Sequence, residues 1–423
     1  MTVDAYEAIR RRTLDRIDSA GIDPEADPDG LQRLVAGAVQ EYQQHAHLGE
    51  GRSLADPAAT VDRLLRSVSA YGHLSGLLNR GDIEEIFIEG DRVTYLEANG
   101  RLAALDTPTT ELENRQVLER MLAATDRRLD ASTPIVQARI LNGGARLTAI
   151  IPPISDHVSA TIRRYALRRQ SLDSLVDLGS LTPAAAGFLA LAMRASASTI
   201  VSGPPGAGKT SFLSALMAAV PADHCIRSGE EVRELHVPIL HGAYYEARPP
   251  SLDGSGEISL RDLVKMILAM RPDLIVVGEV RGAEAFELTR AVNAGCGMAA
   301  TIHANSAVDA LKALVNAALM AGENVPDRVV RNIFASSIDL VVHLGRDVDR
   351  DGTVRRETME IRSLVPSLHD DFSSQPLFER AAPGSALSWT GAMPPEHLSH
   401  RIERLLPRGT TLAEILQGRE VSF

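Results

Sequence analysis

The spacing of apolar residues changes along this chain of 423 residues, and each change marks a different kind of structure. Over residues 4–70, apolar side chains such as Leu31, Leu34 and Val35 recur three or four positions apart. This spacing predicts amphipathic helices, which clusters of Gly and Pro separate. No pattern in the stretch indicates chemistry. We expect residues 1–72 to form a helical N-terminal appendage that serves packing or contact with a partner.

Short alternating strands follow the helical stretch. Residues 83–90 alternate apolar and polar side chains, and the Asn99-Gly100 pair after them is typical of a hairpin turn. A helical pattern near residues 115–125 comes next, and residues 138–151 give a second hairpin pattern. We predict a small mixed α/β domain over residues 73–168.

The third part of the chain has an α/β pattern. Thr182 and Pro183 predict the start of a helix, and short buried strands then alternate with helices up to about residue 345. Such alternation is typical of a parallel sheet wound with helices. We assign residues 169–365 to this larger domain. The Pro- and Ser-rich segment after it ends in short helical patterns, and we interpret residues 366–423 as a C-terminal appendage.

The composition limits the possible functions. Hydrophobic residues make up 44% of the chain and charged residues 23%, as in ordinary globular proteins. The net charge of -11 disfavours binding of duplex nucleic acid, and an aromatic content of 4% disfavours a stacking platform for single strands. We interpret the basic run Arg10, Arg11 and Arg12 as a solvated helix face. Cys225 and Cys296 lie far apart in the sequence, which excludes a disulfide framework and fits a reducing cytoplasm.

The chain shows no signal for membrane insertion. Its first residues carry acidic groups and no apolar core, so we predict no signal peptide. No stretch approaches the roughly 18 uninterrupted apolar residues of a membrane span. Any membrane association is therefore expected to depend on partner proteins.

The strongest functional signal is the segment STIVSGPPGAGKTS at residues 198–211. A short β-branched strand leads into a loop that matches G-x-x-x-x-G-K-[ST], and a helical pattern follows, which makes the match specific. Backbone amides of the loop and the helix N-terminus would face phosphates, Lys209 would neutralise the outer phosphates, and Thr210 would bind Mg²⁺. The predicted nucleotide-binding residues are Gly203, Pro204, Pro205, Gly206, Ala207, Gly208, Lys209, Thr210 and Ser211.

A second signal is the segment MRPDLIVVGEVRG at residues 270–282. A helix that begins near Ser259 precedes it, and Glu279 stands at the C-terminal end of the buried strand, the edge where parallel sheets bind ligands. A carboxylate there can hold Mg²⁺ or orient the attacking water. Glu279 could instead pair with Arg281 as a solvated strand end, but its position seventy residues after Lys209 favours the functional interpretation.

Two weaker signals accompany these motifs. Glu230 and Glu231 follow a short apolar stretch, and adjacent carboxylates beside a metal–phosphate site can activate water or coordinate the ion. An acidic pair at a helix start is the structural alternative. His303 ends a strand after a Gly-rich segment and is a candidate phosphate sensor, although a lone histidine is more often structural. The predicted metal ligands are Thr210, Glu231 and Glu279.

In this order, the motifs GPPGAGKT, EEVREL, VVGEVRG and ATIHANSA resemble those of the secretion ATPase superfamily of type II and type IV systems. Further segments, from IEEIFIEGDRVTYLEANGRL to AGENVPDRVVRNIFASSIDLVVHLGRD, resemble the CpaF subgroup, the motors of tight-adherence (Flp-type) pili. The resemblance covers about residues 31–346. It departs from the family pattern where Glu231 and Val232 replace the usual Asp-Thr, and where Cys296 stands in place of an earlier histidine.

The resemblance implies a RecA-like P-loop ATPase domain, Mg²⁺-dependent hydrolysis of ATP and a homohexameric ring. It also implies a cytoplasmic protein that is bound peripherally to the inner membrane through platform proteins of a pilus or secretion system. ATP would lie between the two domains, where Arg139, Arg146 and Arg163 of the small domain would reach the γ-phosphate. Closure of the domains around ATP would then provide the power stroke.

The same resemblance suggests roles for the motif residues. Glu230 would act as general base, Glu279 would support the metal and the water, and His303 would sense the γ-phosphate. Two rival functions share the nucleotide site. A RecA-like nucleic-acid translocase predicts a basic channel, which the net charge disfavours. A nucleotide-binding scaffold would not hydrolyse ATP, and the intact Lys209, Thr210 and Glu279 argue against it.

Overall fold

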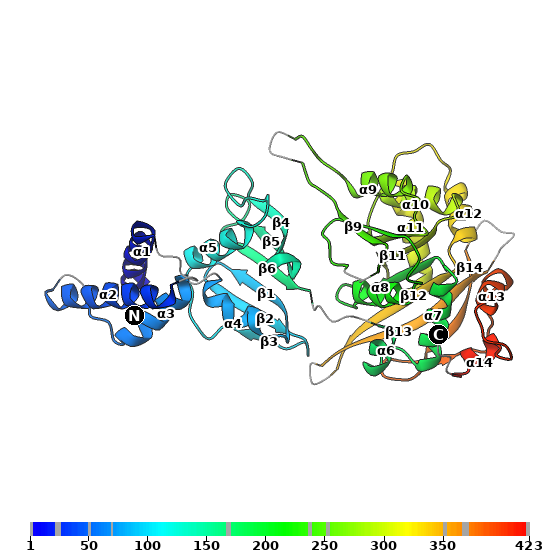
Figure 1. Ribbon diagram of the computed structural model, residues 1–423, viewed down its shortest axis with the longest axis horizontal. Coiled ribbons are helices and arrows are strands. Elements are labelled where there is room, and N and C mark those ends of the chain that lie inside the picture. The colour runs from blue at the N-terminus through cyan, green and yellow to red at the C-terminus, as the bar shows by residue number, and fades with distance from the viewer. Residues whose placement is uncertain are drawn as a thin grey trace. The chain divides into compact units, whose positions relative to one another are not determined.

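The computed structural model describes residues 3–21, 27–49, 52–68, 71–165, 171–235, 239–250, 254–349, 353–365 and 372–419. The chain divides into two compact units, Met1–Ala166 and Leu167–Phe423 (Figure 1). The predicted boundary between residues 168 and 169 lies outside the described residues. Among the described residues, no helix combines the length and apolar character needed to cross a membrane.

The first unit begins with three amphipathic helices, α1 (Val3–Ala20), α2 (Pro28–His47) and α3 (Pro57–Val68). The predicted spacing is found on α2, where Leu31 and Val35 are buried. The Asp27 side chain accepts a hydrogen bond from the Gly30 amide at the start of this helix. The three helices enclose their own small apolar core, so this stretch is folded as helices, as predicted.

One prediction for α1 is wrong. Arg11 and Arg12 are exposed, but only 1% of Arg10 is exposed, so the basic run is not a fully solvated face. Arg10 instead contacts the carboxylate of Glu113 at 3.7 Å and donates to the side chain of Gln116. Both partners lie about a hundred residues later in the sequence, and helical periodicity carries no information about such distant pairing.

A six-stranded antiparallel sheet forms the rest of the first unit, in the order β3-β2-β1-β6-β5-β4. Apolar residues of the strands form one core with α5 and the short helices η1 and α4. The elements are η1 (Gly72–Leu74), α4 (Ser75–Asn79), β1 (Ile83–Glu89), β2 (Arg92–Glu97), β3 (Leu102–Ala104), α5 (Glu111–Leu122), β4 (Ile135–Ile140), η2 (Leu141–Gly143), β5 (Ala145–Ile150) and β6 (Ser159–Arg164).

The second unit is built on a nine-stranded sheet in the order β15-β14-β13-β12-β7-β11-β10-β8-β9. The strands β12, β7, β11, β10, β8 and β9 are parallel to their neighbours within this part of the sheet, as the alternating pattern predicts. Their bounds are β7 (Thr199–Gly203), β8 (Ile226–Glu230), β9 (Gly242–Glu246), β10 (Leu274–Val280), β11 (Gly297–His303) and β12 (Leu340–Val348).

Helices cover both faces of this sheet (Figure 1). Residues of α6, α7, α8, α13 and α14 belong to the core on one face, and residues of α9 to α12 belong to the core on the other. Pro183 begins α7 and Ser259 caps α9, as predicted. The helices are α6 (Leu172–Asp177), α7 (Pro183–Arg194), α8 (Lys209–Ala218), α9 (Leu260–Leu268), α10 (Glu284–Asn293), α11 (Ala307–Leu319), α12 (Asp327–Ser337), α13 (Glu396–Glu403) and α14 (Leu412–Leu416).

The C-terminal segment is part of this sheet and of one of its cores. Strands β13 (Val354–Val365), β14 (Ser373–Arg380) and β15 (Leu387–Trp389) extend the sheet with antiparallel pairing, and α13 and α14 pack on α7. The sequence predicts an appendage here because it is rich in Pro and Ser after Pro366, and Pro376 within β14 is atypical of a strand. The segment β14 forms a strand because it pairs with β13.

A buried carboxylate fastens α13 to the sheet. Asp339, of which 5% is exposed, accepts hydrogen bonds from the Ser198 amide at 2.8 Å and from the Arg401 guanidinium at 3.2 Å. His397 Nε2 lies 3.2 Å from the same carboxylate, and Arg401 also donates to the Ala195 carbonyl. The last helices are thereby tied to the start of β7.

Candidate nucleotide-binding site

The predicted phosphate loop connects β7 to α8. Gly206 and Gly208 have φ angles of 73° and 86°, a region that disfavours residues with a Cβ atom. Gly203 is required for a different reason, because a Cβ atom there would lie 2.6 Å from the carbonyl oxygen of Leu344 on β12. The loop is therefore pressed against the neighbouring strand. All nine residues predicted to bind nucleotide lie in this loop, in the end of β7 or in the first turn of α8.

Lys209 is buried and crosses back over the loop. Its Nζ atom donates to the carbonyl oxygens of Gly203 and Pro204, each at 3.2 Å, and lies 3.1 Å from Nδ1 of His303. His303 ends β11 and pairs in register with Gly203 at the end of β7, which explains why two distant motifs meet here. Since an ammonium group can only donate, Nδ1 of His303 is the acceptor.

His303 also contacts Glu279. Its Nε2 atom lies 2.5 Å from Oε1 of Glu279, and because Nδ1 accepts from Lys209, the ring proton is on Nε2. Burial and the Lys209 cation lower the pKa of His303 below its usual range, so the ring is neutral at pH 7. Glu279 also pairs with Arg281, which lies 3.6 Å from Glu231. Four motifs thus form one chain of polar contacts.

Glu230 lies in the wall of this site. Only 3% of it is exposed, and its carboxyl group accepts hydrogen bonds from the amides of Glu234 at 3.1 Å and Leu235 at 3.2 Å. A Cβ atom on Gly278 would lie 2.6 Å from Cγ of Glu230, so the side chain packs directly against the backbone next to Glu279. Burial raises the pKa of Glu230 to about 8.

The candidate metal ligands at this site suit a Mg²⁺ ion that is bound together with a nucleotide, rather than an ion that is held by protein side chains alone. Thr210 lies in the first turn of α8, and Glu279 and Glu231 are joined to each other through Arg281. Within the described parts of the chain, no group of three or more His, Cys, Asp or Glu residues could hold a metal ion. Mg²⁺ typically binds one or two protein oxygens together with phosphates and water, which this donor set matches.

The three predicted arginines lie in the first unit and form a row across its sheet. Arg139 on β4 pairs in register with Arg146 on β5, and Arg146 pairs with Arg163 on β6. Directly opposed residues share one face of a sheet, so the three side chains leave from the same face. Glu85 continues the row on β1, and its carboxylate accepts from Arg163 Nε at 2.6 Å. Like charges directly opposite each other destabilise a sheet, so this row of three arginines has an energetic cost that Glu85 offsets in part.

Two further arginines contact the phosphate loop, and the sequence analysis missed them. Arg346 on β12 pairs in register with Arg356 on β13. Arg356 Nε donates to the carbonyl of Gly206 at 3.0 Å, and Arg346 Nε lies 3.4 Å from the place where a Cβ atom on Gly206 would stand. The signal was the Asp-Gly pair at residues 351–352 between two arginine-containing segments, which is typical of a hairpin.

Comparisons with known proteins match this geometry. Residues 80–373 match the family described as Type II/IV secretion system protein. A Mycobacterium tuberculosis protein named for conjugal transfer is 32% identical over 323 residues, which cover 72% of this chain and 88% of that protein. The type IV secretion system protein PtlH of Bordetella pertussis is 29% identical over 335 residues, which cover 70% of this chain and 95% of PtlH.

A solved structure shares the fold. The ATPase DotB of Yersinia pseudotuberculosis superposes with a TM-score of 0.50 at 16% identity, over 70% of this chain and 78% of that one. At this identity, the similarity shows the fold alone.

Proposed function

Because the chain belongs to the family of type II/IV secretion system proteins and is an ATP-hydrolysing enzyme of RecA-like fold, we propose that it is the motor of a tight-adherence (Flp-type) pilus machine. The motifs that resemble the CpaF subgroup support this assignment. Relatives named for conjugal transfer and type IV secretion make a type IV secretion motor the second candidate. The observation that carries the ATPase mechanism within this proposal is the contact of His303 with both Lys209 and Glu279 beside the phosphate loop.

Binding of ATP would change the partners of Lys209. Phosphate oxygens are charged acceptors and form stronger hydrogen bonds with an ammonium group than carbonyl oxygens do. Lys209 would therefore leave Nδ1 of His303 and turn to the phosphates. His303 would then be free to direct a ring proton toward the γ-phosphate, which is the sensor role that we propose for it.

Glu279 and Glu230 would both act on the attacking water, in different roles. Glu279 is joined to His303 and Arg281, and we propose that it orients the water and supports Mg²⁺ together with Thr210 and Glu231. Mg²⁺ would neutralise charge that develops on the phosphates. Glu230 is the proposed general base, because a pKa of about 8 suits a proton acceptor near neutral pH. The backbone that donates to its carboxyl group would have to move for it to reach water.

We further propose a homohexameric ring that uses the arginine row of the first unit. Arg139, Arg146 and Arg163 would contact the γ-phosphate, from the same subunit or from a neighbour. Guanidinium groups stabilise the charge of a phosphoryl group in transfer. The contact would therefore weaken after hydrolysis, and the domains that closed around ATP would open. Arg346 and Arg356 would support the loop that holds the phosphates.

The proposed location is the cytoplasm, at the inner face of the membrane, with inner-membrane platform proteins as partners. Nucleic acid is not a proposed partner, because the net charge of -11 disfavours binding to a polyanion. A RecA-like nucleic-acid translocase is the alternative that an experiment must exclude.

Hydrolysis of ATP by the full chain tests the proposal. The rate per subunit, measured with Mg²⁺ over a range of protein concentrations, is expected to rise with concentration and to be unaffected by DNA. Glu279→Gln should abolish turnover but leave nucleotide binding intact, and Glu257→Gln, on an exposed residue of the same unit, should match the wild type. Hydrolysis that depends on DNA would instead support a translocase. Binding without turnover would support a scaffold.

A further inference from the structure

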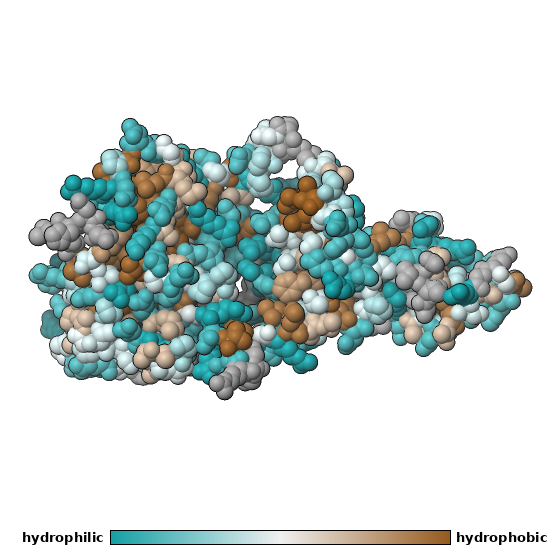
Figure 2. Space-filling view, turned by 180° about the vertical axis from the view of Figure 1, so that it is seen from behind, coloured by the Kyte–Doolittle hydropathy of each residue, from teal (hydrophilic) through white to brown (hydrophobic). Residues whose placement is uncertain are grey.

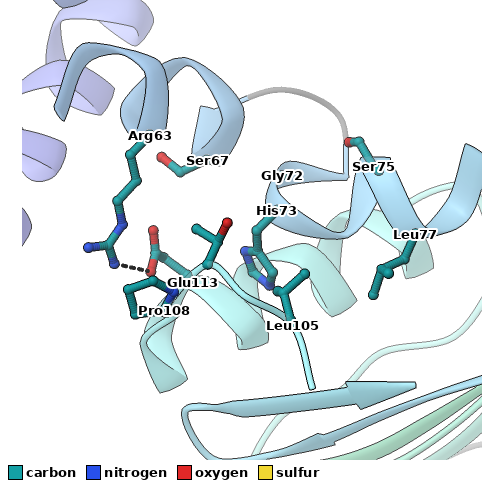
Figure 3. A pocket seen from close by; sticks show the side chains of 11 residues that line it. Arg63, Ser67, Gly72, His73, Ser75, Leu77, Leu105, Pro108 and Glu113 are labelled. Atoms are coloured by element: carbon teal, nitrogen blue, oxygen red, sulfur yellow. Dashed lines mark ion pairs between the residues drawn. The ribbon is translucent and has the colours of Figure 1, made fainter. Parts of the chain in front are cut away.

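A cavity of about 330 Å³ lies in the first unit, where α3 meets η1, α4 and the start of α5. In Figure 3, His73 points into it, with Leu105 and Leu77 nearby and Arg63 paired with Glu113 at one side. The residues Ser67, Ser75 and Thr107 also line it. The cavity is remote in sequence from every motif of the nucleotide site.

Positive charge dominates around this cavity. Glu113, of which 3% is exposed, is shared by Arg10 at 3.7 Å and by Arg63 at 3.6 Å. Arg120 lies behind the cavity wall, where its Nη2 atom donates to the Ser67 carbonyl at 3.4 Å. Among the described residues, no second carboxylate pairs with these three guanidinium groups. Buried charges are normally paired, so the cluster has an excess of cation.

Several buried polar atoms here have no hydrogen-bond partner in the described part of the chain. They are Nε of Arg10, Nε of Arg120, Oδ1 of Asn114 and Nε2 of His73, and of these residues His73 lines the cavity. Arg10 and Asn114 are almost completely buried, so solvent does not compensate them. Such atoms are rare in folded proteins and call for a partner. Burial lowers the pKa of His73 to about 4 against the opposing effects of the Glu113 charge and of the Asn114 side chain beside it, so this imidazole is neutral at pH 7 and adds a polar contact without adding charge.

The rest of the cavity wall is apolar. Leu77 and Leu105 line it on the side away from the Arg63–Glu113 pair, so the cavity has a cationic end and an apolar end, and Pro108 lies beside the ion pair. A volume of about 330 Å³ is at the small end of ligand pockets, which suits a metabolite rather than a nucleotide or a peptide.

We propose that this cavity binds a small soluble metabolite with one oxyanion group, a phosphate monoester or a carboxylate, carried on a short apolar body. The oxyanion would contact Arg63 and His73 and offset the charge of Arg120 behind Gly72. The body would lie against Leu77 and Leu105. Because α3 and α5 both contribute to the wall, the ligand would fasten the helical segment to the sheet of the first unit. This inference does not depend on the proposed function.

Hydrogen–deuterium exchange of the full chain locates such binding. Butyl phosphate and butyrate, which each carry one oxyanion group on a short apolar body, serve as probes, and sodium chloride of equal ionic strength serves as the reference. Peptides covering residues 71–79 and 105–114 should exchange more slowly with a probe, by roughly tenfold at about ten times its dissociation constant. Protection confined to peptides of the phosphate loop, or equal slowing by sodium chloride, would refute the proposal.

Variants connect the protection to the cavity. Arg63→Gln and Arg120→Gln should each abolish protection by the probes, because each removes a cation from the cluster. Arg115→Gln is the matched control. Arg115 lies on α5, the helix that carries Arg120, and pairs on the surface with Glu119. Circular dichroism and ATP hydrolysis confirm that each variant is folded. Arg63 is less buried than Arg10, so its substitution is less disruptive to folding than a substitution of Arg10 would be. Protection by phosphatidylglycerol vesicles but by neither probe would assign the site to a lipid headgroup and overturn the soluble ligand.

Discussion

Glu230 should make the stability of the second unit depend on pH. Burial raises its pKa from 4.5 to about 8, so the folded state binds the proton more tightly than the unfolded state does. The stabilising effect of this proton is fully present below pH 4.5 and is lost as the pH rises toward 8. With about 1.4 kcal/mol per pKa unit, the shift corresponds to a loss of about 3 kcal/mol in the free energy of unfolding between pH 5 and pH 8.

The substitution Glu230→Gln isolates this effect. A neutral amide can still accept a hydrogen bond from the Leu235 amide but does not ionise, so the variant should be less sensitive to pH and more stable than the wild type above pH 8. Urea unfolding of both proteins from pH 5 to pH 9, followed by the fluorescence of Trp389, measures the difference. Glu257→Gln, on an exposed residue, should follow the wild type. Identical pH dependence in wild type and Glu230→Gln would refute the reasoning.

The same residue links stability to catalysis. If Glu230 is the general base, kcat/KM should rise with pH toward about 8, because only the ionised carboxylate accepts a proton. Glu230→Gln should then lower kcat by roughly 10²–10⁴ while it stabilises the fold at high pH. A variant that is more stable and fully active would leave Glu230 a purely structural residue.

Three further predictions concern other contacts. Arg356→Gln should weaken binding of ATP and ADP by similar factors, about 1–3 kcal/mol, because it removes a charged donor to the phosphate loop; calorimetric titration beside Arg355→Gln measures this. Arg146→Gln should lower kcat for ATP hydrolysis but leave ADP affinity unchanged if the arginine row acts on the γ-phosphate, and an equal loss of ADP affinity would contradict that role. Asp339→Ala should cost about 1–3 kcal/mol of stability in urea unfolding, since it leaves the buried Ser198 amide without an acceptor and removes the partner of the partly exposed Arg401, and a loss below about 0.5 kcal/mol would contradict the account of the C-terminal attachment.

The local parts of the fold could be predicted from the sequence. The strand, loop and helix around Lys209 are encoded within residues 198–211, and the start of α9 follows from Ser259, which forms a capping box with Asp262. The glycines at the turns of the phosphate loop are required by the local backbone conformation. These features need no knowledge of distant residues.

Long-range pairing could not be predicted. The contact of His303 with Lys209 depends on the parallel register of β11 with β7, and that of Arg356 with the loop depends on the hairpin β12–β13. Arg10 is buried because Glu113 lies beside it, and nothing in the periodicity of α1 identifies that partner. The strand β14 is also defined by its neighbour rather than by its own residues.

Among the described residues of the second unit, exposed apolar side chains lie on several different elements. Leu178, Leu240 and Met320 are among the large apolar residues with high exposure, and they belong to different elements or connections. The face seen in Figure 2 is mostly hydrophilic, with small separate apolar areas. Isolated surface residues of this kind are common and do not by themselves mark a docking site.

The pairing of β7 has a consequence for synthesis on the ribosome. The strand that leads into the phosphate loop lies between β11 and β12, which are translated about a hundred and about 140 residues later, and its helical cover includes α13 and α14 from the last part of the chain. Until those segments have left the exit tunnel, the nascent ATPase unit lacks both flanking strands and part of its core. Its apolar strands are exposed during this time and are accessible to chaperones. Incomplete polypeptides that end before β12 lack a strand that flanks β7, and they therefore cannot complete the sheet that holds the phosphate loop.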